Sequence, residues 1–253
     1  MSLEACAALV ERGDPDRFRV AMAAPPPARE ILFPLYAFNL EIARAPWATR
    51  EPMLAEMRLQ WWRDQVAACA AGMLPPPHEV LTPLGQLLRE SRLDPAPLDA
   101  LIETRRRDIE AEPFLADDLR TYLEGTAGNL LWAGAKALGS PEPTRPAALQ
   151  AGFASGLASW LLALPELSAR NRGLADETPA TIRALATDAL AALAKARRTR
   201  FGPGTPALRA ATLAAPVLRA ARHDPDAALQ GRLAPPEGPK RLRLLWATLR
   251  GGW

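Results

Sequence analysis

Cysteine and histidine are scarce in this chain of 253 residues, and each occurs only twice. The two cysteines, Cys6 and Cys69, are too few for a disulfide framework, so we expect the protein to work in a reducing compartment. The two histidines, His78 and His223, lie far apart in the sequence, which argues against a zinc site. Valine and isoleucine are also few, and this shortage of β-branched residues argues against β-sheet.

A large excess of charge, nucleotide-binding signatures and long apolar runs are missing as well. The formal net charge is only +3 and no nucleic-acid-binding motif is present, so nucleic acid is not an expected partner. The sequence has no phosphate loop and no dinucleotide fingerprint. It also has no run of about 18 apolar residues, and its first ten residues lack the basic flank of a signal peptide. We therefore expect neither a membrane span nor a secretory signal.

Alanine, leucine and proline are abundant instead. Alanine and leucine favour helices, and the 26 prolines mark helix starts and ends, because proline cannot donate the hydrogen bond of a helix interior. The prediction is an all-α fold, a single-domain helical bundle over residues 1–253. Helices are predicted from Asp14 to the prolines at 25–27, and then at about 28–45, 51–71, 79–92, 96–111, 116–138, 145–164, 181–200, 206–222 and 240–250.

Several short motifs recur in a recognisable order. Leu35–Arg44 reads Leu-Tyr-Ala-Phe-Asn-Leu-Glu-Ile-Ala-Arg, and Tyr122–Gly128 reads Tyr-Leu-Glu-Gly-Thr-Ala-Gly. Between and after these segments lie Arg58, Gln60, Trp61, Trp62, Asp108 and the triplet Gly152-Phe153-Ala154. In this order and spacing the chain resembles the squalene/phytoene synthase family, most strongly over residues 14–175. The resemblance implies a bundle of the isoprenoid synthase type.

The metal-binding residues of that family are replaced here. Its enzymes hold diphosphate substrates through Mg²⁺ bound by two Asp-rich motifs of the form DxxxD. The matching positions are Ala43, Arg44 and Trp47 in the first motif and Ala163 and Leu167 in the second. Mg²⁺ needs oxygen ligands, and apart from their backbones these residues supply none. We therefore predict no catalytic residues, no metal site and no cofactor.

One branch of the family shares these departures. Phe38–Ala43 and Arg58–Asp64 resemble a non-catalytic branch that includes a mitochondrial assembly factor for respiratory complex I. The resemblance implies a protein partner, either a subunit of a respiratory complex or another assembly factor. We expect a cytoplasmic protein that attaches peripherally to the inner membrane or to a membrane-bound partner. Two alternatives stay open: a prenyltransferase that joins two prenyl diphosphates head-to-head, and a lipid or isoprenoid carrier.

A residual cavity is expected where the enzymes bind their prenyl chains, since the matching helices remain apolar. A lipid or isoprenoid is the expected guest, and Arg44 is expected at the mouth. The predicted cavity residues are Asn39, Glu41, Arg44, Tyr122, Gly125, Asn129 and Trp160. Gly125 and Gly128 are expected to permit close helix packing. The run Arg105–Arg107 lies among acidic residues and is interpreted as a solvated, salt-bridged face.

The segment Lys240–Arg250 combines an apolar stripe with basic residues. Leu242, Leu245, Trp246 and Leu249 recur at helical spacing, and Lys240, Arg241, Arg243 and Arg250 lie between and beside them. This is the pattern of a helix that lies on an anionic membrane. It is also the pattern of a last helix packed on the bundle, which is the favoured interpretation.

Overall fold

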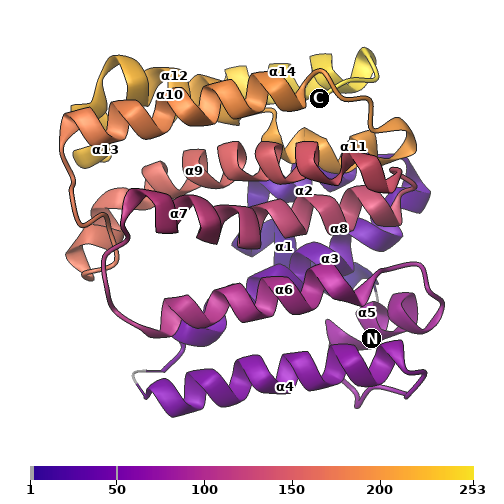
Figure 1. The fold of residues 1–253 in the computed structure, drawn as a ribbon. Coiled ribbons are helices and arrows are strands. Elements are labelled where there is room, and N and C mark those ends of the chain that lie inside the picture. The colour runs from indigo at the N-terminus through magenta and orange to yellow at the C-terminus, as the bar shows by residue number, and fades with distance from the viewer. Residues whose placement is uncertain (1–2, 50) are drawn as a thin grey trace.

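The structure, a computed structural model, describes residues 3–49 and 51–253 and is built from helices joined by short connections (Figure 1). No β-strand occurs in this part of the chain, where residues 114 and 174 form one isolated bridge. The α-helices are α1 (Leu3–Gly13), α2 (Pro15–Met22), α3 (Pro26–Arg44), α4 (Pro52–Ala70), α5 (Leu81–Arg89), α6 (Pro95–Arg105), α7 (Ala116–Leu123), α8 (Asn129–Ala137), α9 (Arg145–Ala169), α10 (Pro179–Ala196), α11 (Thr205–Leu208), α12 (Ala214–His223), α13 (Pro225–Leu229) and α14 (Glu237–Leu249). The all-α prediction is confirmed.

Proline and a polar cap start many of these helices. Asp14 precedes Pro15, and its carboxylate accepts a hydrogen bond from the backbone N–H of Arg17. Thr178 caps α10 in the same way, ahead of Pro179. Proline fits the first helical turn because its missing N–H would have no partner there.

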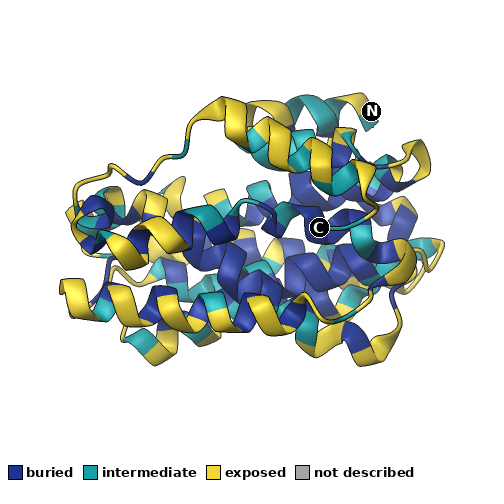
Figure 2. Cartoon of the chain, turned by 90° about the horizontal axis from the view of Figure 1, so that it is seen from above, coloured by how far each residue is buried: buried dark blue, intermediate teal, exposed yellow. Residues whose placement is uncertain are grey.

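Helix α9 runs through the centre of the bundle, with α10 and α12 on one side and α8 on the other (Figure 1). The burial map shows that the buried residues concentrate in the middle of the bundle (Figure 2). Over Glu142–Ala169 this helical stretch is long and apolar enough for a membrane span by composition, which the sequence analysis did not anticipate. In the bundle 67% of its most apolar window is buried.

Several predicted boundaries are wrong. Helices α1 and α13 were not predicted, and the predicted helix 96–111 ends at Arg105 and continues as a 3-10 turn. Pro165 does not end its helix, and α9 continues to Ala169. The proline removes one helical hydrogen bond, but Leu161 and Leu164 just before it stay buried in the core and hold the helix in place. The predicted helix 116–138 is interrupted by a π-helical turn, Glu124–Gly128. The predicted helix 206–222 is split into α11, a 3-10 turn at Arg209–Ala211, and α12.

Close packing explains the glycines around the π-helical turn. A Cβ on Gly125 would lie 2.4 Å from Thr104 Oγ1, and one on Gly152 would lie 2.2 Å from the Cα of Gly128. Contacts this short are not tolerated, so the backbones of α9 and the π-helical turn touch only because glycines face each other. The predicted packing role of Gly125 and Gly128 is confirmed.

The last helix lies on the bundle, as favoured, but its apolar stripe is not the side that packs. None of the residues of α14 is buried, and the predicted apolar stripe faces solvent. Leu242, Leu245, Trp246 and Leu249 are 57%, 53%, 56% and 72% exposed. The opposite side of the helix, with Lys240, Leu244 and Thr248, is partly buried against the bundle. Helix α14 therefore presents an unpartnered apolar stripe at the surface.

Candidate functional site

A cavity of about 260 Å³ lies where the two degenerate metal motifs meet. Its wall is formed by the turn after α3, the segment between α6 and α7, the π-helical turn and the last turns of α9. Both apolar and charged side chains line the cavity. The lining includes Arg17, Asn39, Trp47, Arg105, Arg107, Asp108, Glu110, Glu112, Phe114, Tyr122, Leu123, Trp160, Ala163, Leu167 and Arg172.

Residues of both degenerate motifs reach this cavity. Trp47 from the first motif, and Ala163 and Leu167 from the second, line it, whereas Ala43 and Arg44 do not. The Arg172 guanidinium lies 4.3 Å from the centre of the Trp47 ring, and that of Arg170 lies 5.3 Å from it. An aromatic face with two guanidiniums occupies the position where the resembled enzymes carry a carboxylate.

A buried ion pair with a tyrosine, formed by Arg105, Asp108 and Tyr122, stands in the wall. Arg105 Nη1 donates to Asp108 Oδ2 at 3.0 Å and to the Tyr122 hydroxyl at 2.6 Å. The Tyr122 hydroxyl in turn donates to Asp108 Oδ2 at 2.9 Å. Burial raises the pKa of Tyr122 and holds it neutral. Arg105 thus balances the charge of Asp108 within the cavity wall.

The remaining charges of the cavity are also paired or stacked. Arg107 lies 3.6 Å from Glu110 and over the ring of Phe114. Arg172 Nη1 donates to the backbone carbonyl of Asp108, and Arg17 pairs with Asp14. Guanidiniums occupy the space between the carboxylates, so the wall already carries its own counter-charges.

A Mg²⁺ cluster does not fit this set of residues. Mg²⁺ needs several free carboxylate oxygens on converging side chains. The most buried carboxylate, Asp108, is engaged by Arg105 and Tyr122, and both positions of the second motif are apolar. Across residues 3–49 and 51–253 no group of three His, Cys, Asp or Glu residues could hold a metal ion.

The seven predicted cavity residues fall in three places. Asn39, Tyr122 and Trp160 line the cavity. Gly125 and Asn129 do not: the Asn129 amide donates to the Gly125 carbonyl at 2.9 Å, within the helix.

Glu41 and Arg44 line a separate, open groove between α3 and α4, together with Leu54, Met57 and Trp61. The prediction that Arg44 stands at the mouth of the central cavity is therefore wrong. Successive side chains of a helix are rotated by about 100° from one another, and this rotation directs Arg44 into the groove beside α4 and not into the cavity.

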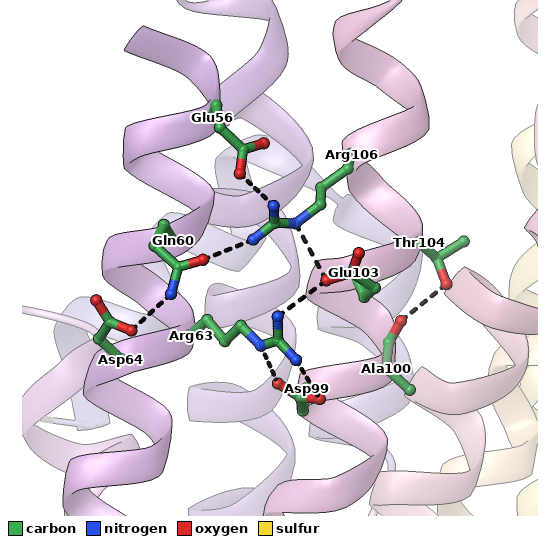
Figure 3. Close-up of polar contacts among 9 residues, drawn as sticks. All are labelled: Glu56, Gln60, Arg63, Asp64, Asp99, Ala100, Glu103, Thr104 and Arg106. Atoms are coloured by element: carbon green, nitrogen blue, oxygen red, sulfur yellow. Dashed lines mark hydrogen bonds and ion pairs between the residues drawn. The ribbon is translucent and has the colours of Figure 1, made fainter. Parts of the chain in front are cut away.

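Two of the three consecutive arginines line the cavity. Arg105 is buried in its wall, and Arg107 also donates to backbone carbonyls of the following loop. Arg106 reaches α4, where it bonds Glu56 and Gln60 beside the ion pairs of Arg63 with Asp99 (Figure 3). The interpretation of the whole run as a solvated face is wrong for Arg105, whose side chain is only 18% exposed.

Sequence reasoning missed Arg105, Arg107 and Arg172 as cavity residues. The helix ends at Arg105 and continues as a 3-10 turn, so helical spacing does not apply across the run. For Arg172 the only signal was its place just after the second degenerate motif.

Comparison with known proteins gives a consistent family. The family model for squalene/phytoene synthases matches residues 10–238. Among curated proteins, the chain is similar to NADH dehydrogenase (ubiquinone) complex I, assembly factor 6, with 27% identity to the Bos taurus protein and 25% to the Homo sapiens protein. Each match covers 170 residues, which is 66% of this chain and 50% of the relative. The chain thus matches about half the length of these curated relatives.

Two solved structures of similar fold are synthases. A crystal structure of a dehydrosqualene synthase with ligand superposes with a TM-score of 0.78 at 15% identity, covering 98% of this chain and 95% of that one. Squalene synthase HpnC from Alicyclobacillus acidocaldarius superposes with a TM-score of 0.65 at 14% identity, covering 98% and 94%. At such identities the likeness is one of fold.

Proposed function

The chain belongs to the squalene/phytoene synthase family, and we propose that it is a member that acts by binding, not catalysis, in assembling a membrane-associated respiratory complex. The observation that carries this proposal is the cavity at the degenerate motifs. Its buried carboxylate is neutralised by Arg105, and Ala163 and Leu167 stand in the second motif. Such a wall offers a diphosphate no metal cluster to bind.

The curated relatives support the assembly role. Those that match are named as assembly factors of NADH dehydrogenase complex I in both mammals and Drosophila melanogaster. A protein partner, either a subunit of that complex or another assembly factor, follows as part of the proposal. The apolar part of the cavity wall, with Phe114, Leu123 and Trp160, keeps a lipid or isoprenoid guest within the proposal as well.

A cell-based experiment tests the assembly role. The gene is deleted in the organism that encodes it, and assembled complex I is measured by NADH dehydrogenase activity on native gels. We expect less assembled complex in the deletion strain and its recovery when the intact gene is returned. A strain with normal complex I that lacks a squalene- or phytoene-type product would contradict the proposal and favour the prenyltransferase.

We propose further that α14 holds the protein peripherally on the cytoplasmic face of the inner membrane. Its exposed stripe of Leu242, Leu245, Trp246 and Leu249 supplies the apolar contact. Two basic side chains of the same segment, Arg243 and Arg250, are exposed as well. An amphipathic helix of this kind binds anionic lipid surfaces, with about 1 kcal/mol for each basic residue near the surface.

Co-sedimentation with anionic vesicles tests this attachment in the intact chain. We expect Trp246→Gln to lose most of the binding at low salt. The matched control is Trp61→Gln, since Trp61 is 37% exposed but lies on α4, on the far side of the bundle from α14 (Figure 1). Equal binding by the two variants would contradict the membrane role of α14.

A further inference from the structure

A second cavity, of about 110 Å³, lies between α2, α9, α12 and the inner side of α14. It is separate from the cavity at the degenerate motifs, although Arg17 and Ser159 contribute to both. Five basic side chains and only two acidic ones line it. The basic residues are Arg17, Arg19, Arg209, Lys240 and Arg241, and the acidic ones are Asp14 and Asp16.

Arg209 is the unusual member of this lining. It is only 7% exposed, and its guanidinium is held by two backbone carbonyls: Nε donates to Gly252 at 3.2 Å and Nη1 to Ala23 at 3.3 Å. Within residues 3–49 and 51–253 no carboxylate lies within 4.0 Å of it, and Nη2 makes no hydrogen bond. Burial lowers the pKa of Arg209. A buried cation without a counter-charge is costly, and an anion in the adjoining cavity would remove that cost.

The other basic residues separate into paired and unpaired groups. Arg17 pairs with Asp14, Arg19 pairs with Asp16 at 2.8 Å, and Lys240 lies 3.3 Å from Asp16. Arg241, at the rim on α14, has no ion pair in the described part of the chain. Two guanidiniums, those of Arg209 and Arg241, therefore line the cavity without a carboxylate.

The rest of the wall suits an amphiphile. Ser155, Ser159 and Thr212 add hydroxyl groups, while Val20, Leu162, Leu213, Val217 and Leu244 add apolar surface. Guanidinium forks match the oxygen geometry of a phosphate group. Because α14 forms part of the wall, its inner side faces the cavity while its apolar stripe faces outward.

We propose that this cavity binds a phosphate group without a metal, and that the group belongs to the headgroup of an anionic membrane phospholipid. Arg209 and Arg241 hold the phosphate oxygens, and the apolar wall contacts the first carbons of the lipid. The site deepens the proposed membrane attachment, but it does not depend on it, because a soluble lipid can reach the cavity without a bilayer.

Calorimetric titration of the intact protein tests the site with three probes. These are dihexanoyl phosphatidylglycerol, the zwitterionic dihexanoyl phosphatidylcholine and inorganic phosphate, all below their micelle-forming concentrations where that applies. We expect saturable binding of the phosphatidylglycerol and none of the phosphatidylcholine. Binding of inorganic phosphate with the same dependence on Arg241 would keep the phosphate site and assign it to free phosphate.

Two variants on the same helix provide the matched comparison. Arg241→Gln should weaken phosphatidylglycerol binding about ten-fold, the size expected for one charge-assisted hydrogen bond. Arg243→Gln removes the same charge from the same helix at a position that does not line the cavity. This variant should bind phosphatidylglycerol as the unchanged protein does. No saturable binding, or equal loss in both variants, would overturn the proposal. Arg209→Met should abolish binding, but Arg241 decides the outcome if that variant does not fold.

A Trp246 variant separates lipid binding in the cavity from vesicle binding by α14. Trp246→Gln should keep its affinity for the short-chain lipid, because Trp246 does not line the cavity. If α14 does not bind vesicles, the cavity result is unaffected. If the cavity does not bind phosphate, the vesicle result still stands on its own.

Discussion

Replacing Asp108 by asparagine should destabilise the protein strongly in the absence of any ligand. Asp108 is 9% exposed and is the counter-charge of Arg105, whose side chain is 18% exposed. The variant leaves that guanidinium buried and unbalanced, and breaking such a pair costs about 3–5 kcal/mol. Asparagine keeps one oxygen that can accept the hydrogen bond of the Tyr122 hydroxyl. We therefore expect the free energy of unfolding to fall by about 3 kcal/mol, the lower end of that range.

The assay is thermal unfolding followed by circular dichroism, without added metal. For a chain of this length about 1 kcal/mol corresponds to roughly 2–4 °C, so the midpoint should fall by about 6–12 °C. Glu110→Gln is the control: Glu110 is 67% exposed and lies 3.6 Å from Arg107, and its loss should change stability by less than about 0.5 kcal/mol.

A melting midpoint within about 2 °C of that of the unchanged protein corresponds to at most about 1 kcal/mol and would contradict the expected cost of the broken ion pair. It would mean that Asp108 is free to serve another partner, such as a metal ion. In that case Mg²⁺ should also raise the melting temperature of the unchanged protein, which the internal ion pair does not predict.

Three further predictions follow from contacts elsewhere. Gly152→Ala should cost about 3 kcal/mol or more, because its Cβ would lie 2.2 Å from the backbone of the π-helical turn, whereas Gly238→Ala, with no atom within 4 Å, should be nearly neutral in urea unfolding. Burial alone would raise the pKa of Asp94, but hydrogen bonds from Lys136 and from a backbone N–H outweigh burial and lower that pKa. The ionised Asp94 therefore stabilises the fold fully at neutral pH, and this contribution is lost in acid. The stability difference from Asp94→Asn should stay constant from about pH 7 to pH 5 and shrink below about pH 4. Burial raises the pKa of Cys6 to about 12, so iodoacetamide should label it at pH 8 only after unfolding, and rapid native labelling would contradict its placement.

The fold could be predicted because its signals are local. Alanine and leucine set the helices, and prolines with polar caps set most of their starts, as at Asp14 and Thr178. Pro165 misled because the apolar faces of α9 pack in the core and offset the hydrogen bond that the proline removes. The π-helical turn at Glu124–Gly128 has no signature in the sequence beyond its two glycines.

The candidate site was only partly predictable, because it depends on contacts distant in sequence. The replacement of the second motif's aspartates by Ala163 and Leu167 could be seen from the resemblance to the family. The ion pair of Arg105 with Asp108 and the stacking of Arg172 on Trp47 could not, since they require the direction of each side chain. Exposure of the α14 stripe was equally hidden, because an amphipathic pattern does not say whether a bundle or another surface covers its apolar side.

We propose that this member of the family acts by binding and does not catalyse prenyl transfer. The most direct measurement is pyrophosphate release from farnesyl and geranylgeranyl diphosphate, with and without Mg²⁺, beside an active squalene synthase as positive control. We expect no pyrophosphate release above a protein-free blank with either substrate. Mg²⁺-dependent release that grows with protein concentration, together with a squalene- or phytoene-type product, would contradict it.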